Sequence, residues 1–148
     1  MNIGEITITS CKIGKKIVMG YWSHIDNYDY EVENDDAPSE KVKNAINAFN
    51  RVLAASFYVE NTNDAAHFIT NGFVVHEKDG VQYLEIKGKC VTKDGDPVSV
   101  SSGKIAYEEA GETMNELIAD KLMDARLALF DFMFAEKSVQ KKLYEENK

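Results

Sequence analysis

Cysteine and proline are scarce in this sequence, with two of each among 148 residues. Cys11 and Cys90 are too few for a disulfide framework, so we expect a reduced, cytoplasmic setting. No apolar run approaches the roughly 18–20 residues that a membrane-spanning helix needs. The N-terminal residues alternate between apolar and polar types, and we expect no secretion signal there. The sequence therefore predicts a chain that does not enter a membrane.

Arginine is also scarce, because only Arg51 and Arg126 stand beside fifteen lysines. Arginine is the residue that most often holds phosphate or carboxylate groups through paired hydrogen bonds. The net charge is −8, and residues 25–66 contain nine acids and three bases. A negative field repels nucleic-acid backbones and attracts basic surfaces, so a basic protein partner is favoured over nucleic acid. We take this lysine-rich, acidic composition as typical of a bacterial or phage accessory protein.

The first 58 residues predict strands followed by a helix. Residues 1–36 form an N-terminal hairpin and then an acidic segment. Within that segment, residues 28–33 alternate between apolar and acidic types, so a strand would carry tyrosines on one face and carboxylates on the other. Residues 39–58 carry apolar side chains at helical spacing and predict one amphipathic helix, capped by Asp36 or Ser39.

Residues 66–106 predict a three-stranded meander, because Asp79-Gly80 and Asp94-Gly95 separate three alternating runs. The elements then follow the order ββ(β)-α-βββ-α. We therefore expect a single α+β domain over residues 1–148. It would contain an antiparallel β-sheet of five or six strands with two helices packed on one face.

Residues 112–146 predict a C-terminal helix, which we expect to break near residue 137 because an unbroken helix would be longer than the domain. Between residues 122 and 135 its apolar side chains surround the whole cylinder. Such a helix is either enclosed by its own chain or shared between subunits. Because a small domain offers little to enclose it, we expect a homo-oligomer whose interface contains the apolar residues outside the main stripe. These residues are Met123, Leu127, Phe130 and Phe134.

The sequence lacks the common motifs of catalysis and cofactor binding. The three histidines and two cysteines do not stand at the spacing of a zinc site. Gly103-Lys104 resembles the end of a phosphate-binding loop, but Val98 occupies the position where that loop needs its first glycine. No Gly-x-Ser-x-Gly sequence marks a catalytic serine. We therefore expect a protein that is not an enzyme, with no metal, no cofactor and no catalytic residue.

Three functional hypotheses follow. The first is a non-enzymatic, homo-oligomeric binding protein whose acidic segment engages a basic protein partner. Its binding residues would be Tyr28, Tyr30, Glu31, Glu33, Asp35 and Asp36. The second is an accessory protein that binds single-stranded nucleic acid with an aromatic side chain beside lysines on the solvent-facing side of the meander. Its residues would be Tyr83, Lys87, Lys89 and Lys104. The third is a small-ligand or nucleotide binder with a pocket at a subunit seam, near His67 or His76.

Overall fold

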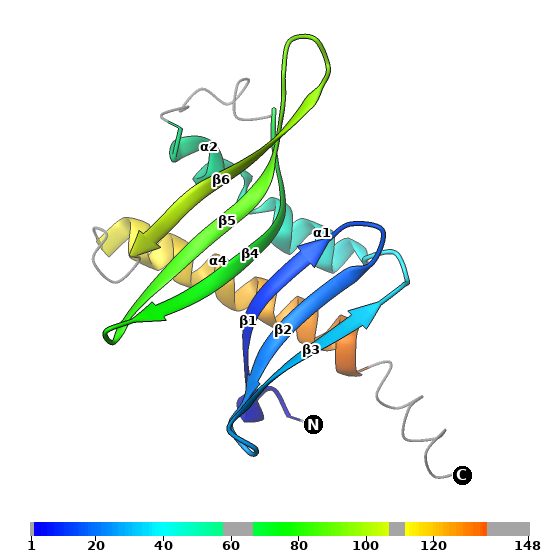
Figure 1. Cartoon of the computed structure of the whole chain (residues 1–148), viewed down its shortest axis with the longest axis vertical. Helices are drawn as coiled ribbons and strands as arrows, with labels where there is room; N and C mark the ends of the chain where they lie inside the picture. The colour runs from blue at the N-terminus through cyan, green and yellow to red at the C-terminus, as the bar shows by residue number, and fades with distance from the viewer. Residues whose placement is uncertain (1, 58–66, 107–111, 136–148) are drawn as a thin grey trace.

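The computed structural model describes residues 2–57, 67–106 and 112–135 (Figure 1). Its strands are β1 (Ile6–Ile13), β2 (Ile17–Ser23), β3 (Tyr28–Asn34), β4 (Phe68–Lys78), β5 (Val81–Val91) and β6 (Pro97–Ala106). Its helices are α1 (Glu40–Asn47), α2 (Asn50–Ala55) and α4 (Glu112–Phe130). The strands form one sheet in the order β3-β2-β1-β4-β5-β6, and all neighbours are antiparallel. The expected α+β class is confirmed, with six strands.

The sheet consists of two three-stranded meanders joined at a short seam between β1 and β4. The seam contains only three register pairs, in which Ser10, Cys11 and Lys12 face Val74, Phe73 and Gly72. A β-carbon at Gly72 would collide with the carbonyl oxygen of Cys11, so only glycine permits this close approach of the two backbones. The two meanders are therefore held in one sheet by a short stretch of pairing between β1 and β4.

The tight turn between β4 and β5 follows the predicted Asp-Gly signal. Asp79 and Gly80 have φ values of 54° and 80°, and two adjacent left-handed residues are what a type I′ turn requires. This turn has the twist that continues an antiparallel hairpin without a bulge at its tip. The three predicted strands of the meander are thus β4, β5 and β6, which extend from Phe68 to Ala106, whereas residue 66, where the meander was expected to begin, lies outside the described residues.

The expected single helix over residues 39–58 is wrong in one respect, because the chain forms α1 and α2 with a turn at Ala48 and Phe49 between them. The Ser39 hydroxyl accepts a hydrogen bond from Val42 N at 3.2 Å and caps α1 as one of the two predicted caps. The side chain of Asn50, at the start of α2, accepts a 2.7 Å hydrogen bond from the backbone N–H of Thr70 on β4. The helix is thus interrupted where Asn50 bonds to the sheet, although the helical spacing of apolar residues continues from α1 into α2.

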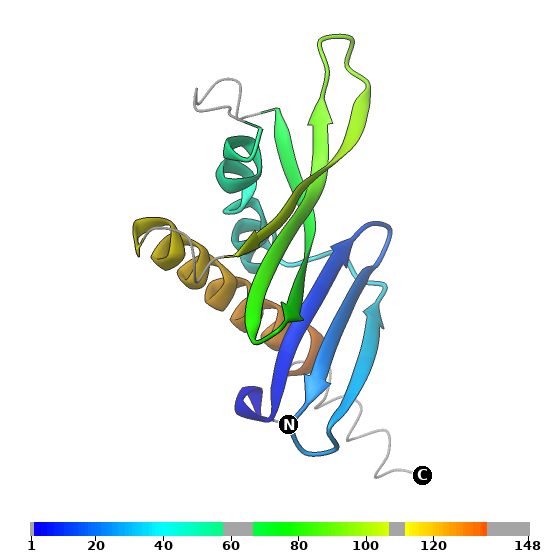
Figure 2. The same cartoon turned by 60° about the vertical axis from the view of Figure 1, so that its left-hand side comes forward.

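All three helices lie on one face of the sheet, and the opposite face carries no helix of the described chain (Figure 2). The core between the layers contains Phe49, Leu53, Phe73 and Ile86, none of which is exposed to solvent. Beyond residue 130, α4 widens into a π-helical turn over Asp131–Ala135. The break expected near residue 137 lies outside the described residues.

Candidate binding surface

The face of the sheet that no described helix covers is called here the outer face. Alternation along each strand decides which side chains reach it. On β5, Leu84 and Ile86 are fully buried against the helices, so Glu85 and Lys87 point to the outer face. On β2, Tyr21 is buried and contacts Phe134 of the π-helical turn, which places its strand neighbours on the outer face.

Strand β3, at one edge of the sheet, places three carboxylates on the outer face. We call Asp29, Glu31 and Glu33 the acidic β3 surface. Glu33 forms a 2.7 Å ion pair with Lys16 of the preceding hairpin. In the described part of the chain, Asp29 and Glu31 have no ion-pair partner. Asp35 and Asp36 follow the strand and extend the negative charge beyond its end.

The two tyrosines of β3 lie on the other side of the strand. Tyr30 stacks on Tyr21 with ring centres 5.4 Å apart, and Tyr28 meets Tyr30 edge-on. The Tyr30 hydroxyl donates a hydrogen bond to Asp26, and this bond raises the pKa of Tyr30 above its usual range. The six predicted partner-binding residues therefore do not form one continuous strip, because alternation separates the tyrosine rings from the carboxylates of Glu31 and Glu33.

The second predicted set lies together on the opposite half of the outer face. Tyr83, Lys87 and Lys89 alternate along β5, and Lys104 of β6 is the register partner of Glu85. We call Lys87, Lys89 and Lys104 the basic patch. All three lysines are exposed. The two halves of the outer face thus carry charges of opposite sign, separated by the middle strands of the sheet.

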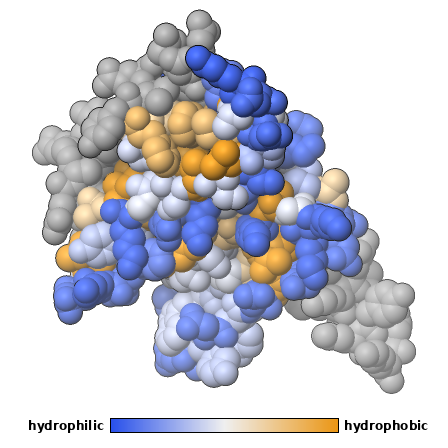
Figure 3. All heavy atoms as spheres, turned by 45° about the horizontal axis from the view of Figure 1, so that its top comes forward, coloured by the Kyte–Doolittle hydropathy of each residue, from blue (hydrophilic) through white to orange (hydrophobic). Residues whose placement is uncertain are grey.

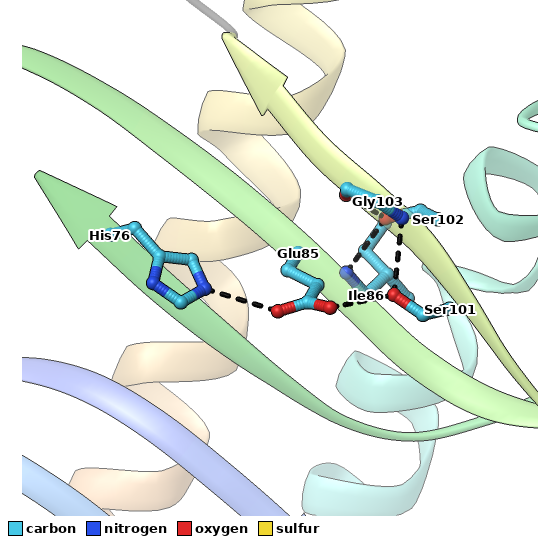
Figure 4. A network of polar contacts seen from close by, with 6 residues as sticks. All are labelled: His76, Glu85, Ile86, Ser101, Ser102 and Gly103. Atoms are coloured by element: carbon cyan, nitrogen blue, oxygen red, sulfur yellow. Dashed lines mark hydrogen bonds and ion pairs between the residues drawn. The ribbon is translucent and has the colours of Figure 1, made fainter. Parts of the chain in front are cut away.

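A polar network crosses three strands at the rim of the basic patch (Figure 4). The carboxylate of Glu85 accepts a 2.7 Å hydrogen bond from Ser101 and lies 3.1 Å from Nε2 of His76. The Ser101 bond is the main reason that the pKa of Glu85 lies below its usual range, and the His76 contact adds to it. A catalytic triad has its histidine between serine and acid, whereas here the acid stands in the middle. This serine therefore has a weak base beside it, and the network acts as a cross-strand brace.

The predicted oligomer interface on α4 is only partly exposed. Phe130 is 9% exposed, and Phe134 packs against Tyr21 with ring centres 5.4 Å apart. Phe130 is thus nearly covered by its own chain and Phe134 is partly covered, and the role of the two rings in an oligomer interface stays a prediction. Met123 and Leu127 remain 61% and 42% exposed. Across the view in Figure 3, hydrophobic residues reach the surface in patches between hydrophilic ones.

A hollow of about 430 Å³ opens where β1 and β4 diverge beyond the seam. Trp22 and His24 line one side of it, and Glu77 of β4 lies on the other. From α4 below, Arg126 Nε donates a 2.9 Å hydrogen bond to the carbonyl of Ile8. The histidine at this hollow is His24, whereas the third hypothesis placed a pocket near His67 or His76. His24 Nε2 lies 2.7 Å from the Thr7 hydroxyl.

Among the described residues, no three histidine, cysteine or acidic side chains gather closely enough to hold a metal ion. None of the described helices combines the length and apolar character needed to cross a membrane. Comparison with protein-family models, with curated proteins and with solved structures finds no match to this chain. The shape and charge of the surface are therefore the features that indicate a function.

Proposed function

We propose that this chain is a non-enzymatic binding protein that engages a basic protein surface through the acidic β3 surface. The observation that carries the proposal is the position of Asp29, Glu31 and Glu33 on one bare face of an edge strand. Their carboxylates lie side by side at alternate positions of β3. Asp35 and Asp36 add charge at the end of the strand.

Electrostatics supports a partner of opposite sign. An exposed cluster of like charges attracts a complementary surface at long range and speeds association, while repelling surfaces of its own sign. Edge strands also carry charges for protection against edge-to-edge pairing, and such charges need no partner. The two roles make different predictions, because only a binding surface loses a partner when its carboxylates are neutralised.

The test compares proteins captured from the source organism by three forms of the tagged chain. The first is the wild type. The neutralised variant carries Asp29→Asn, Glu31→Gln, Glu33→Gln and Asp35→Asn. The control variant loses four exposed carboxylates elsewhere, through Asp79→Asn, Asp94→Asn, Asp96→Asn and Asp120→Asn. Both variants have the same net charge, so a difference between them reports on position and not on total charge.

We expect a protein with a basic surface to be captured by the wild type and by the control variant, and to be lost from the neutralised variant. The purified partner should then bind the wild type in calorimetry with an affinity that falls as salt rises, because surface ion pairs are screened. If the neutralised variant retains every partner that the control variant retains, β3 is a protected edge and the proposal is wrong.

A second candidate function has support from one observation. The four residues of the nucleic-acid hypothesis share the outer face, with Tyr83, Lys87 and Lys89 at alternate positions of β5. A single-stranded oligonucleotide could stack on the ring and pair its phosphates with the lysines. Fluorescence anisotropy at roughly 50 mM salt, where phosphate contacts are strong, tests this function. Binding that disappears with Lys87→Ala and Lys89→Ala would support it, and no binding by the wild type would exclude it.

A further inference from the structure

The outer face carries opposite charges at its two sides. The acidic β3 surface lies at one edge, and the basic patch lies on β5 and β6 at the other. Some charged residues depart from this division. Lys12 lies on the central strand β1, and Lys16 pairs with Glu33 at the acidic edge. Glu85 lies beside the basic patch, where Ser101 and His76 already engage its carboxylate. A face with opposite charges on opposite sides is complementary to a copy of itself.

The strand order decides which arrangement of two copies uses this complementarity. A two-fold axis parallel to the strands reverses the strand order of the second copy, so β3 of each copy lies over β5 and β6 of the other. A two-fold axis across the strands would instead place β3 over β3 and bring like charges together, which is unfavourable. Only the first arrangement pairs carboxylates with lysines, and it does so twice.

We propose that a second copy of this chain docks face to face on the outer face, about a two-fold axis parallel to the strands. In this dimer the acidic β3 surface of each copy meets the basic patch of the other. The inference rests on the proposed function, because it identifies the basic partner surface as that of a second copy. It also moves self-association from α4, where it was expected, to the sheet.

The middle of the outer face suits the centre of such an interface. Val18 and Trp22 of β2 and Val74 of β4 lie there half-buried, and Ile69 of β4 is 47% exposed. Interfaces typically have an apolar centre and a charged rim. Stacked sheets lie about 10 Å apart with their strands within about 30° of each other, a separation that lysine and glutamate side chains can bridge together.

The experiment measures the mass of the full chain by light scattering and its dimer dissociation constant by analytical ultracentrifugation. An acid-reversed variant carries Asp29→Lys and Glu31→Lys, and leaves the ion pair of Lys16 with Glu33 in place. A base-reversed variant carries Lys87→Glu and Lys89→Glu. Circular dichroism and thermal melting establish that each variant is folded. The wild type is also measured at roughly 50 and 500 mM salt, which needs no variant and reports on charge pairing alone.

We expect the wild type to dimerise, with a dissociation constant that rises about tenfold or more at the higher salt. Each reversed variant alone should be a monomer, and an equimolar mixture of the two should form a heterodimer, because one outer face is then basic and the other acidic. A wild type that stays monomeric, or reversed variants that both still dimerise, would overturn the inference. If the wild type is a monomer and yet loses a basic partner on neutralisation of β3, this inference fails while the proposed function stands.

Discussion

Gly72→Ala tests how strongly the two meanders depend on their seam. The new β-carbon would lie more than about 1 Å inside ordinary contact distance of the Cys11 carbonyl oxygen, a backbone atom that no rotamer change can move. The strands must therefore separate at a seam of three register pairs. Overpacking costs roughly 1–3 kcal/mol and each lost hydrogen bond about 0.5–1.5 kcal/mol, so we expect a loss of about 2–4 kcal/mol.

Urea unfolding followed by circular dichroism measures this loss. With a slope of about 2 kcal/mol per molar urea, the midpoint should fall by about 1–2 M. Gly14→Ala is the matched control, because a β-carbon there would meet no atom within 4 Å and its backbone has no positive φ. We expect this control to lie within about 0.5 kcal/mol of the wild type. Equal midpoints for Gly72→Ala and Gly14→Ala would refute the close approach of β1 and β4.

Three further predictions concern single side chains. Thr70 has a buried hydroxyl with no hydrogen-bond partner in the described structure. Thr70→Val should therefore raise the free energy of unfolding by about 1 kcal/mol. A free energy of unfolding below that of the wild type would mean that the hydroxyl does form a hydrogen bond. The pKa of Glu85 is lowered by the Ser101 hydroxyl first and then by the neighbouring imidazole. The ionised Glu85 side chain therefore stabilises the fold fully above the ordinary glutamate pKa. This stabilisation is lost as the pH falls through the lowered pKa of Glu85. Glu85→Gln should destabilise at neutral pH, and the difference from the wild type in thermal melting should vanish in acid; a difference that persists there would contradict the assignment. Burial raises the pKa of the Cys11 thiol to about 12, whereas Cys90 is half-buried. A thiol reagent at pH 8 should thus modify Cys90 alone in the folded chain and both cysteines in denaturant, and rapid labelling of Cys11 would show that its site is open.

The parts of the fold that local pattern decides were predictable. Period-two alternation identified the strands and their faces, and the Asp79-Gly80 turn followed from its left-handed residues. The break between α1 and α2 was not predictable, because the hydrogen bond from Thr70 to Asn50 joins residues 20 positions apart. The pairing of β1 with β4 could not be predicted from the sequence either, since only three residues of each strand take part in it.

The candidate surface was predictable in part for the same reason. Alternation in residues 28–33 already separates the tyrosines from the carboxylates, yet grouping them as one acidic strip ignored that separation. The opposition between the acidic β3 surface and the basic patch requires the strand order, because β3 and β5 are separated along the sheet by three other strands. No local pattern in the sequence reports this order, so the charge division of the outer face appears only in the assembled sheet.

Packing within one chain accounts for most of the apolar side chains that surround α4 and the turn after it. The π-helical turn packs three consecutive side chains, Phe132, Met133 and Phe134, against the core, which a regular amphipathic helix does not do. Among the large apolar side chains described between residues 118 and 134, only Met123 and Leu127 are exposed. Two such side chains fall far short of the roughly 800 Å² per partner that a stable interface buries. Met123→Ser with Leu127→Ser should therefore leave the mass measured by light scattering unchanged, whereas the charge-reversed variants lower it. If the serine variant becomes a monomer while the charge-reversed variants remain dimers, α4 and not the sheet carries the interface.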